Sequence, residues 1–326
     1  MKVLVAGGAG FIGSHLCASL LKNDYKVICL DNFLTGKKAN VENLLTNPKF
    51  LLVNADVTKS LPEAISEEKL DYIFHLASPA SPNQLSHLSY MNLPLETIDA
   101  NSIGTRRLLR LARKHRAKFL FASTYEVYGD PKEHPQKETY WGYVNPVGQR
   151  SCYDESKRFG EALTFVYIRR FKLDARIVRI FNTYGPKMDI KDGRAVANFI
   201  VQALTNQPLT IYGTGKQTRS FCYVDDLVEG LKKAMFIEAT KGQVINLGNP
   251  DEFTVLELAK RIKKAAQSAS PIVIEAKKLP ADDPEKRRPD ISRAKKLLDW
   301  QPKIKFSQGL KKTIAYFQDK LANEQK

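Results

Sequence analysis

The sequence lacks a long apolar run. None of its hydrophobic segments approaches the ~20 residues that a membrane-spanning helix needs, and the start, MKVLVAGGAG, passes directly into a strand-like segment. A secretory signal would need a basic stretch, an apolar stretch and a cleavage site in that place. We therefore expect a soluble, cytoplasmic protein with no signal peptide and no membrane partner.

Cysteine and histidine are also scarce. The four cysteines (Cys17, Cys29, Cys152 and Cys222) stand alone in apolar or helical surroundings, and the five histidines cluster neither with them nor with each other. Such isolated cysteines favour buried thiols in a reducing compartment over disulfides. No metal site is expected, because the ligand spacings of a metal centre are missing.

Negative charge is scarce outside the first part of the chain. The formal net charge is +16, but residues 1–100 contain 8 Lys and Arg against 10 Asp and Glu, a net of −2, so the rest carries +18. The basic segment TRRLLRLARKHRAK (105–118) suggests either a nucleic-acid contact or an amphipathic helix. The helix is favoured, because apolar residues recur at helical spacing and no nucleic-acid motif accompanies them. The residues expected to face inward are Leu108, Leu109, Leu111 and Ala112.

The first residues contain a glycine-rich turn between a strand-like and a helix-like segment. In KVLVAGGAGFIGSHLCASLL, Gly7, Gly10 and Gly13 have the spacing G-x-x-G-x-x-G. This context is typical of a turn that brings backbone N–H groups close to a dinucleotide pyrophosphate. A second strand ends at Asp31, 18 residues past Gly13, where a carboxylate can bind the ribose diol of NAD and would repel the 2′-phosphate of NADP. The alternatives, purely structural glycines and Asp31 as a turn cap, are weaker because all features occur in order.

Further strands alternate with helical segments along the chain. This alternation predicts an α/β fold, a doubly wound parallel sheet of the Rossmann type. Expected strands lie at 50–57, 71–78, 118–124 and 175–182, with a helix over roughly 155–172. Ligands of such sheets bind at the carboxyl ends of the strands. One crevice should therefore receive Ser78, Thr124, Glu126, Asn182 and Thr183.

The loop-rich remainder suggests a second, smaller unit. We expect residues 1–180 to form the NAD-binding domain, with contributions from about 220–250. Residues 181–326 should form mainly a substrate-binding α/β domain, interleaved with the first because no low-complexity linker separates them.

A candidate acid–base pair lies in CYDESKRFGEAL. Tyr153 and Lys157 are four residues apart and therefore share one face of a helix. A nearby ammonium favours the phenolate, so we expect Lys157 to lower the pKa of Tyr153. Thr124, at a strand end, can share the hydrogen bond of a substrate hydroxyl. Such a pair removes a hydroxyl proton while hydride leaves the same carbon for nicotinamide.

Several motifs give the chain a family resemblance. GGAGFIG, LDNFLTG, HLASPAS, YDESK and IFNTYGP resemble the extended short-chain dehydrogenase/reductases that act on nucleotide sugars, the NAD-dependent epimerase/dehydratase family. Longer blocks over about residues 1–315 resemble UDP-glucuronate decarboxylases (UDP-xylose synthases) more closely. These blocks are EVYGDPKEHPQKETYWGYVNPVGQRSCYDESKR, LTIYGTGKQTRSF, INLGNP and DDPEKRRPDI.

The resemblance implies an NAD-dependent carboxy-lyase. C4 of UDP-glucuronate would be oxidised, CO2 lost from the 4-keto acid, and the product re-reduced to UDP-xylose. It also implies a homodimer. Two other functions stay open, namely another nucleotide-sugar epimerase or 4,6-dehydratase and a catalytically inactive NAD-binding regulator. The intact set of Thr124, Tyr153 and Lys157 counts against the regulator. A nucleic-acid-binding protein is a third class of function, but we expect no specific binding of nucleic acid.

The resemblance also assigns site residues. Tyr153 would be the C4 base, assisted by Lys157 and Thr124, while Glu126 would act near C5 and C6 and Arg287 near the sugar carboxylate. The implied substrate contacts are Tyr125, Asn182, Tyr212, Gln217, Arg219 and Arg287. The implied cofactor contacts are Gly7, Gly10, Phe11, Ile12, Gly13, Asp31, Asn32, Phe33, Thr35, Gly36, Asp56, Val57, Leu76, Ser78, Ala122, Tyr153, Lys157, Thr183 and Arg194.

Tyr125 departs from the family pattern. The decarboxylases usually have a Ser between the Thr and the Glu, and the 4,6-dehydratases have an Asp there. A phenol cannot act as that Asp does, which argues against a dehydratase. Glu126 argues against a 4-epimerase, which commonly has a small or apolar residue at that place. We expect Tyr125 to reshape the pocket wall and leave the chemistry to Tyr153.

Overall fold

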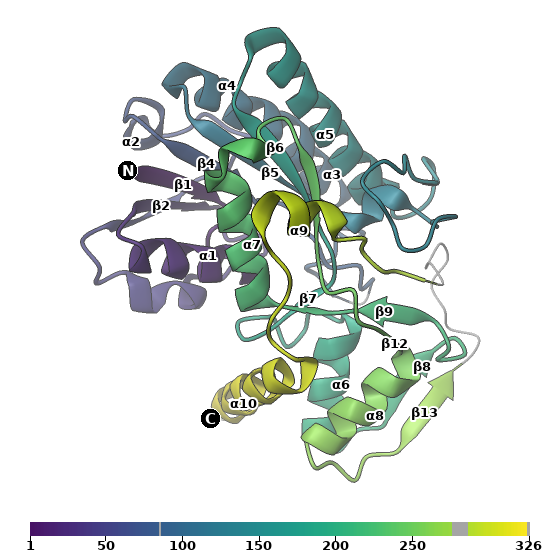
Figure 1. Cartoon of the computed structure of the whole chain (residues 1–326). Coiled ribbons are helices and arrows are strands. Elements are labelled where there is room, and N and C mark those ends of the chain that lie inside the picture. Colours follow the sequence, from purple (N-terminus) through teal and green to yellow (C-terminus); the bar gives the residue numbers. More distant parts are fainter. Residues whose placement is uncertain (85, 276–285, 325–326) are drawn as a thin grey trace.

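A seven-stranded parallel sheet is the centre of the molecule (Figure 1). The structure is a computed structural model and describes residues 1–84, 86–275 and 286–324. The strands are short and apolar, and most are buried on both faces, as expected of parallel strands covered by helices. In spatial order they are β11 (Val244–Leu247), β6 (Ala175–Ile180), β5 (Lys118–Thr124), β4 (Tyr72–His75), β1 (Lys2–Ala6), β2 (Lys26–Asp31) and β3 (Phe50–Asn54).

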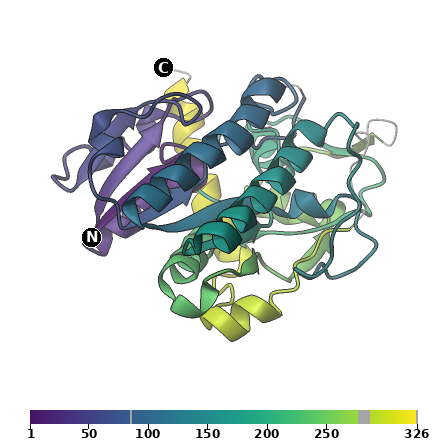
Figure 2. The ribbon, with the colours of Figure 1, turned by 90° about the horizontal axis from the view of Figure 1, so that it is seen from above.

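Helices cover both faces of this sheet. Helices α1 (Phe11–Lys22) and α7 (Val224–Phe236) pack against one face. The other face carries α4 (Thr105–His115) and α5 (Ser151–Phe171), which lie side by side in Figure 2. The predicted doubly wound Rossmann-type fold is thereby confirmed. In the described part of the chain, no helix combines the length and apolarity needed to cross a bilayer.

The basic segment at 105–118 is an amphipathic helix, as predicted. In α4, Leu108, Leu109, Leu111 and Ala112 are buried against the sheet. Helix α5 begins at Ser151, four residues before the expected start. This earlier start places Tyr153 in the first turn of α5, close to the carboxyl ends of the strands.

A second layer of elements lies beneath the sheet in Figure 1, and its chain segments alternate with those of the sheet. It pairs short strands in twos and packs α6 (Ala195–Leu204) on α8 (Val255–Ala265). Its strand pairs are β10 (Cys222–Tyr223) with β7 (Thr183–Tyr184), β12 (Glu252–Thr254) with β9 (Thr218–Ser220), and β13 (Ile272–Glu275) with β8 (Leu209–Tyr212). The remaining helices are α2 (Glu63–Ser66), α3 (Pro94–Asp99), α9 (Ser292–Leu298) and α10 (Phe306–Glu324), with a π segment at Ala100–Gly104 and 3-10 turns at Lys38–Asn40, Glu42–Leu44, Tyr125–Tyr128 and Glu238–Thr240.

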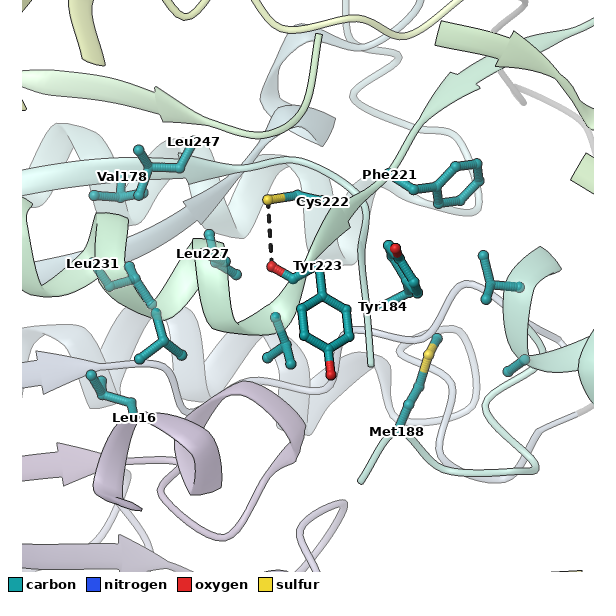
Figure 3. Close-up of a cluster of buried hydrophobic side chains, with 14 of the residues drawn as sticks. Leu16, Val178, Tyr184, Met188, Phe221, Cys222, Tyr223, Leu227, Leu231 and Leu247 are labelled. Atoms are coloured by element: carbon teal, nitrogen blue, oxygen red, sulfur yellow. Dashed lines mark hydrogen bonds between the residues drawn. The ribbon is translucent and has the colours of Figure 1, made fainter. Parts of the chain in front are cut away.

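One apolar cluster joins the sheet to the second layer (Figure 3). It combines Leu16 of α1, Val178 of β6 and Leu227 of α7 with Tyr184 and Phe221 from the segments that lead away from the sheet. Close packing across this junction holds the two layers together, so the cavity between them has fixed walls.

Candidate active site

A cavity of about 880 Å³ opens at the carboxyl ends of the strands and extends between the two layers. The five strand-end side chains expected in one crevice all line it, which confirms that part of the sequence analysis. They are Ser78, Thr124, Glu126, Asn182 and Thr183. A cavity of this size suits a ligand as large as a dinucleotide or a nucleotide sugar.

The glycine turn forms one end of the cavity and leaves no room for side chains. Gly7 has φ +79°, and a Cβ there would lie 2.6 Å from the backbone nitrogen of Ala77. A Cβ on Gly13 would lie 2.1 Å from the carbonyl oxygen of Gly7. Helix α1 starts directly after the turn, and Gly10 provides no side-chain cap to its free N–H groups. This cradle of backbone donors fits a pyrophosphate.

Asp31 stabilises the glycine turn through hydrogen bonds to its backbone. Its Oδ2 accepts a hydrogen bond from the backbone N–H of Ala9 at 2.9 Å, and its Oδ1 accepts one from Phe33 at 2.9 Å. Burial raises the pKa of Asp31, and these backbone hydrogen bonds oppose the rise. The carboxylate thus braces the loop, the role that the sequence analysis held as the alternative, while binding of a ribose diol by its remaining lone pairs stays a prediction.

Most of the predicted cofactor contacts come together. Six lie at the ends of β2 and β3 and do not line the cavity: Asp31, Asn32, Phe33, Gly36, Asp56 and Val57. The lining set is Gly7, Gly10, Phe11, Ile12, Gly13, Thr35, Leu76, Ser78, Ala122, Tyr153, Lys157, Thr183 and Arg194. Arg194 is held by Asp192, with Nε 2.5 Å from Oδ1.

Tyr153 and Lys157 face the cavity from the first two turns of α5. The Lys157 ammonium donates to the carbonyl oxygen of Ala122 at 2.8 Å and lies 5.7 Å from the centre of the Tyr153 ring. Tyr90 stacks on Tyr153 with 4.7 Å between ring centres and 5° between planes. The phenol is therefore held in one orientation at the edge of the sheet.

The expected lowering of the Tyr153 pKa is wrong for this structure. Burial raises the pKa of Tyr153, and the hydrogen bond with Thr124 opposes that rise only in part. Burial also lowers the pKa of Lys157 to about 7, so at neutral pH the lysine carries only part of its charge. Desolvation thus disfavours the charged forms of both side chains, the phenolate of Tyr153 and the ammonium of Lys157 that was expected to stabilise it.

Glu126 is clamped between two arginines. Its Oε2 lies 2.7 Å from Nη2 of Arg150 and 2.7 Å from Nη2 of Arg287. Burial alone would raise the pKa of Glu126, but the two guanidiniums hold it at about 2. The carboxylate is therefore ionised at every pH at which the protein would work.

Counted over the described residues, this cluster of Glu126, Arg150 and Arg287 has more positive than negative charge. Arg287 is only 2% exposed, and its Nε and Nη1 have no hydrogen-bond partner among the described residues. The nearby Asp154 does not neutralise the excess, because burial and the charge of Glu126 raise its pKa to about 8. A buried guanidinium with free donors is costly unless an anion pairs with it.

Tyr125 lies beside this cluster. Its ring centre is 4.3 Å from Cζ of Arg287 and 5.2 Å from the ring centre of Phe181. Its hydroxyl donates to Oδ1 of Asn182 at 2.8 Å. Both Tyr125 and Asn182 line the cavity.

The predicted nucleotide contacts lie at the far end of the same cavity. Tyr212 ends β8, and Gln217 and Arg219 lie at the start of β9 and within it. Gln217 donates to the carbonyl oxygen of Tyr212 at 2.7 Å, which fixes the loop between them. Their contact with a uridine diphosphate stays a prediction. Of the motif DDPEKRRPDI, the first four residues (282–285) lie outside the described part of the chain.

Sequence reasoning missed Arg150, Tyr90 and Asp154. Arg150 stands three residues before Tyr153, and that spacing at a helix start was a usable signal. Tyr90 comes from a distant loop and carries no local signal. Among the described residues, no group of three His, Cys, Asp or Glu side chains is placed to hold a metal ion.

Comparisons with known proteins show the family of the chain. Residues 4–313 match the family described as GDP-mannose 4,6 dehydratase. UDP-glucuronic acid decarboxylase 1 of Arabidopsis thaliana is 49% identical over 99% of this chain and 71% of its own length, and that of Danio rerio is 47% identical over 99% and 74%.

Solved structures agree as well. The UDP-glucuronic acid 4-epimerase of Bacillus cereus, solved with UDP-glucuronic acid and NAD, has a TM-score of 0.87 at 31% identity and covers 98% of this chain and 99% of its own. These matches span nearly the whole chain, and the curated relatives share the decarboxylase name. The chain therefore belongs to the UDP-glucuronic acid decarboxylases, within the nucleotide-sugar epimerase/dehydratase family.

Proposed function

We propose that this protein decarboxylates UDP-glucuronate to UDP-xylose with NAD as its cofactor. The observation that carries the proposal is the buried Arg287, which pairs with Glu126 through Nη2 and whose Nε and Nη1 have no partner among the described residues. Arg287 lines the same cavity as Tyr153. A sugar whose C5 substituent is a carboxylate would pair with this guanidinium, whereas a hydroxymethyl group would not carry the matching charge.

Direct decarboxylation of the sugar would leave an unstabilised carbanion at C5, so a ketone at C4 is needed first. NAD+, when bound, would supply the hydride acceptor for C4 and the hydride donor for the final reduction. Tyr153 takes the proton of the C4 hydroxyl and later gives it back. Between these steps the C5–C6 bond breaks, CO2 leaves, and the electron pair forms an enolate that a solvent proton quenches at C5.

The arginines bind and orient the reacting acid. Nε and Nη1 of Arg287 have no partner among the described residues and can donate to the C6 carboxylate, while Arg150 pairs with the same Oε2 of Glu126 that Arg287 contacts. Because Glu126 has a pKa of about 2, we assign it the task of anchoring the two guanidiniums and not that of a resting proton donor. Positive charge that stays in place after CO2 leaves would also stabilise the enolate.

The two ends of the cavity fit the two nucleotides. The glycine turn with Gly7, Gly10 and Gly13 would hold the pyrophosphate of NAD, while Tyr212 and Arg219 would hold the uridine diphosphate. On this proposal residues 1–180, together with about 220–250, form the cofactor domain, and residues 181–326 form mainly the substrate domain.

We also propose that the protein acts as a homodimer in the cytoplasm. Large apolar side chains are exposed along α3, the π segment and α5, which cover the same face of the sheet. They are Leu95 (71% exposed), Ile98 (39%), Ile103 (43%), Phe159 (52%) and Val166 (47%). A second copy would cover this strip. The four free cysteines suit a reducing compartment.

The test is to incubate the purified protein with UDP-glucuronate, with and without added NAD+, and to follow the nucleotide sugars by mass spectrometry. The proposal expects the loss of one CO2 and a UDP-pentose product, abolished in Tyr153→Phe. A product of unchanged mass with inverted C4 would instead identify a 4-epimerase. If the protein turned over another nucleotide sugar but not UDP-glucuronate, its substrate would be a different one and the proposal would be overturned.

A further inference from the structure

Tyr125 contacts two buried polar groups, Arg287 and Asn182, that have donors without a partner among the described residues. Its ring face lies 4.3 Å from Cζ of Arg287, and its hydroxyl donates to Oδ1 of Asn182 at 2.8 Å. Nη2 of Arg287 is bound to Glu126, but Nε and Nη1 have no partner among the described residues. The Nδ2 of Asn182 is likewise buried without a partner among them.

The two contacts of Tyr125 have different physical characters. The ring face of Tyr125 attracts the guanidinium of Arg287 electrostatically. It accepts no hydrogen bond from the N–H groups in the guanidinium plane, so these donors stay available for a substrate. The hydroxyl fixes the amide of Asn182 with its oxygen toward Tyr125, which leaves the NH2 for another acceptor. Phe181, 5.2 Å from Tyr125, supports the ring itself.

We propose that Tyr125 is a positioning residue with two separable tasks: its ring holds Arg287 for an anionic sugar substituent, and its hydroxyl holds Asn182 for any sugar in the pocket. This inference rests on the proposed function, because it assumes that a uronate is the substrate. It gives a reason for a bulky residue at the place where the decarboxylases usually have a Ser. A serine at this place has no ring to support the guanidinium.

The two tasks predict two different binding effects. Tyr125→Phe keeps the ring and loses the hydroxyl, so it should weaken UDP-glucuronate and UDP-glucose by the same factor, about threefold to tenfold. Tyr125→Leu loses the ring as well. It should weaken UDP-glucuronate at least about tenfold more than UDP-glucose, because only the uronate depends on the placement of Arg287.

The experiment is calorimetric titration of the NAD-loaded protein with UDP, UDP-glucose and UDP-glucuronate, using a Tyr153→Phe background to prevent turnover. UDP binding should stay unchanged in every variant, since UDP reaches the nucleotide end only. Tyr140→Leu is the matched control. Tyr140 belongs to the same aromatic cluster and stacks on Tyr128, but it does not line the cavity. It should leave the ratio of uronate to glucose affinity unchanged.

Two outcomes would overturn the inference. The first is a Tyr125→Leu variant in which the ratio of UDP-glucuronate affinity to UDP-glucose affinity is unchanged. The second is a Tyr125→Phe variant in which this ratio falls as much as in Tyr125→Leu. The Phe variant preserves volume, so it decides the matter if the Leu variant does not fold. Failure of the proposed function is distinguishable, since it would appear as absent turnover of UDP-glucuronate by the unmodified protein, whatever the binding ratios are.

Discussion

The two halves of the cavity are built from different parts of the chain. The cofactor half is centred on the glycine turn from Gly7 to Gly13, where a Cβ at Gly7 or Gly13 would collide with neighbouring backbone. The sugar half consists of side chains that come from four distant places: Glu126, Arg150, Asn182 and Arg287. The glycine turn therefore depends on the absence of side chains at Gly7 and Gly13, whereas the sugar half depends on the charge and polarity of its side chains.

This difference decides how each half responds to change. Substitutions other than proline keep the backbone N–H groups, so the glycine turn should fail when a new side chain obstructs it. The sugar half pairs buried charges, so the loss of Glu126 or Arg287 removes a charge that its partner depends on. Substitutions at the junction and in each half make the comparison testable.

The largest effect is expected at Tyr153, where the two halves meet. Tyr153→Phe removes the acid–base group and should lower kcat for UDP-glucuronate by about 10³-fold, within the usual range for this kind of catalysis. NAD content and the affinity for UDP-glucuronate should change less than about threefold. Steady-state kinetics and calorimetry measure both, and a kcat within tenfold of the unmodified protein would remove Tyr153 from this role.

The next effect concerns the charge balance of the sugar half. Glu126→Gln removes the carboxylate that pairs with the buried Arg287, so the free energy of unfolding at pH 7 should fall by about 3 kcal/mol. UDP-glucuronate should restore more of this loss than UDP-glucose, because it brings a replacement anion. Urea unfolding with each ligand measures the difference. Equal restoration by both ligands would contradict an excess of positive charge at the sugar.

The cofactor half should fail when its turn gains a methyl group. Gly7 has a positive φ (+79°), and Gly7→Ala would bring a Cβ to 2.6 Å from the backbone nitrogen of Ala77, so NAD affinity should fall by at least about 100-fold while UDP affinity stays the same. Gly242→Ala is the control. Gly242 also has a positive φ (+72°), but nothing lies within 4 Å of its Cβ position. An equal loss of NAD affinity in both variants would show that backbone strain and not close approach is responsible.

The smallest effect is a pH dependence of stability at Asp154. The pKa of this carboxyl in the folded protein is about 8, raised by burial and by Glu126 from an ordinary value of 3.8. Its protonation in the folded state therefore contributes stability that is fully present below pH ~4 and is lost as the pH rises toward 8. Asp154→Asn cannot ionise, so its stability relative to the unmodified protein should increase by about 1 kcal/mol or more between pH 5.5 and 8.5.

Chemical unfolding at several pH values measures this difference. Asp319→Asn, at an exposed position of α10, should show no such trend. A difference between Asp154→Asn and the unmodified protein that stays constant with pH would mean that Asp154 is already ionised in the folded state.

The comparison also explains what could be predicted from the sequence. The sheet, the glycine turn and the pairing of Tyr153 with Lys157 follow from local patterns, because apolar alternation and spacing along one helix are encoded in neighbouring residues. Glu126 pairs with Arg150 and Arg287, which lie 24 and 161 positions further along the sequence. No periodic pattern in the sequence reveals contacts between such distant residues. The pKa of Tyr153 was predicted in the wrong direction because burial is a property of the folded chain.

The most direct test of the account is turnover of UDP-glucuronate labelled with ¹³C at C6, in heavy water, followed by NMR. The account predicts that the label leaves the sugar as CO2 and that UDP-xylose carries one solvent-derived deuterium at C5. Label that stays bonded to C5 while the C4 configuration inverts would contradict it. The excess charge beside Tyr153 would then serve to bind the uronate and not to remove its carboxylate.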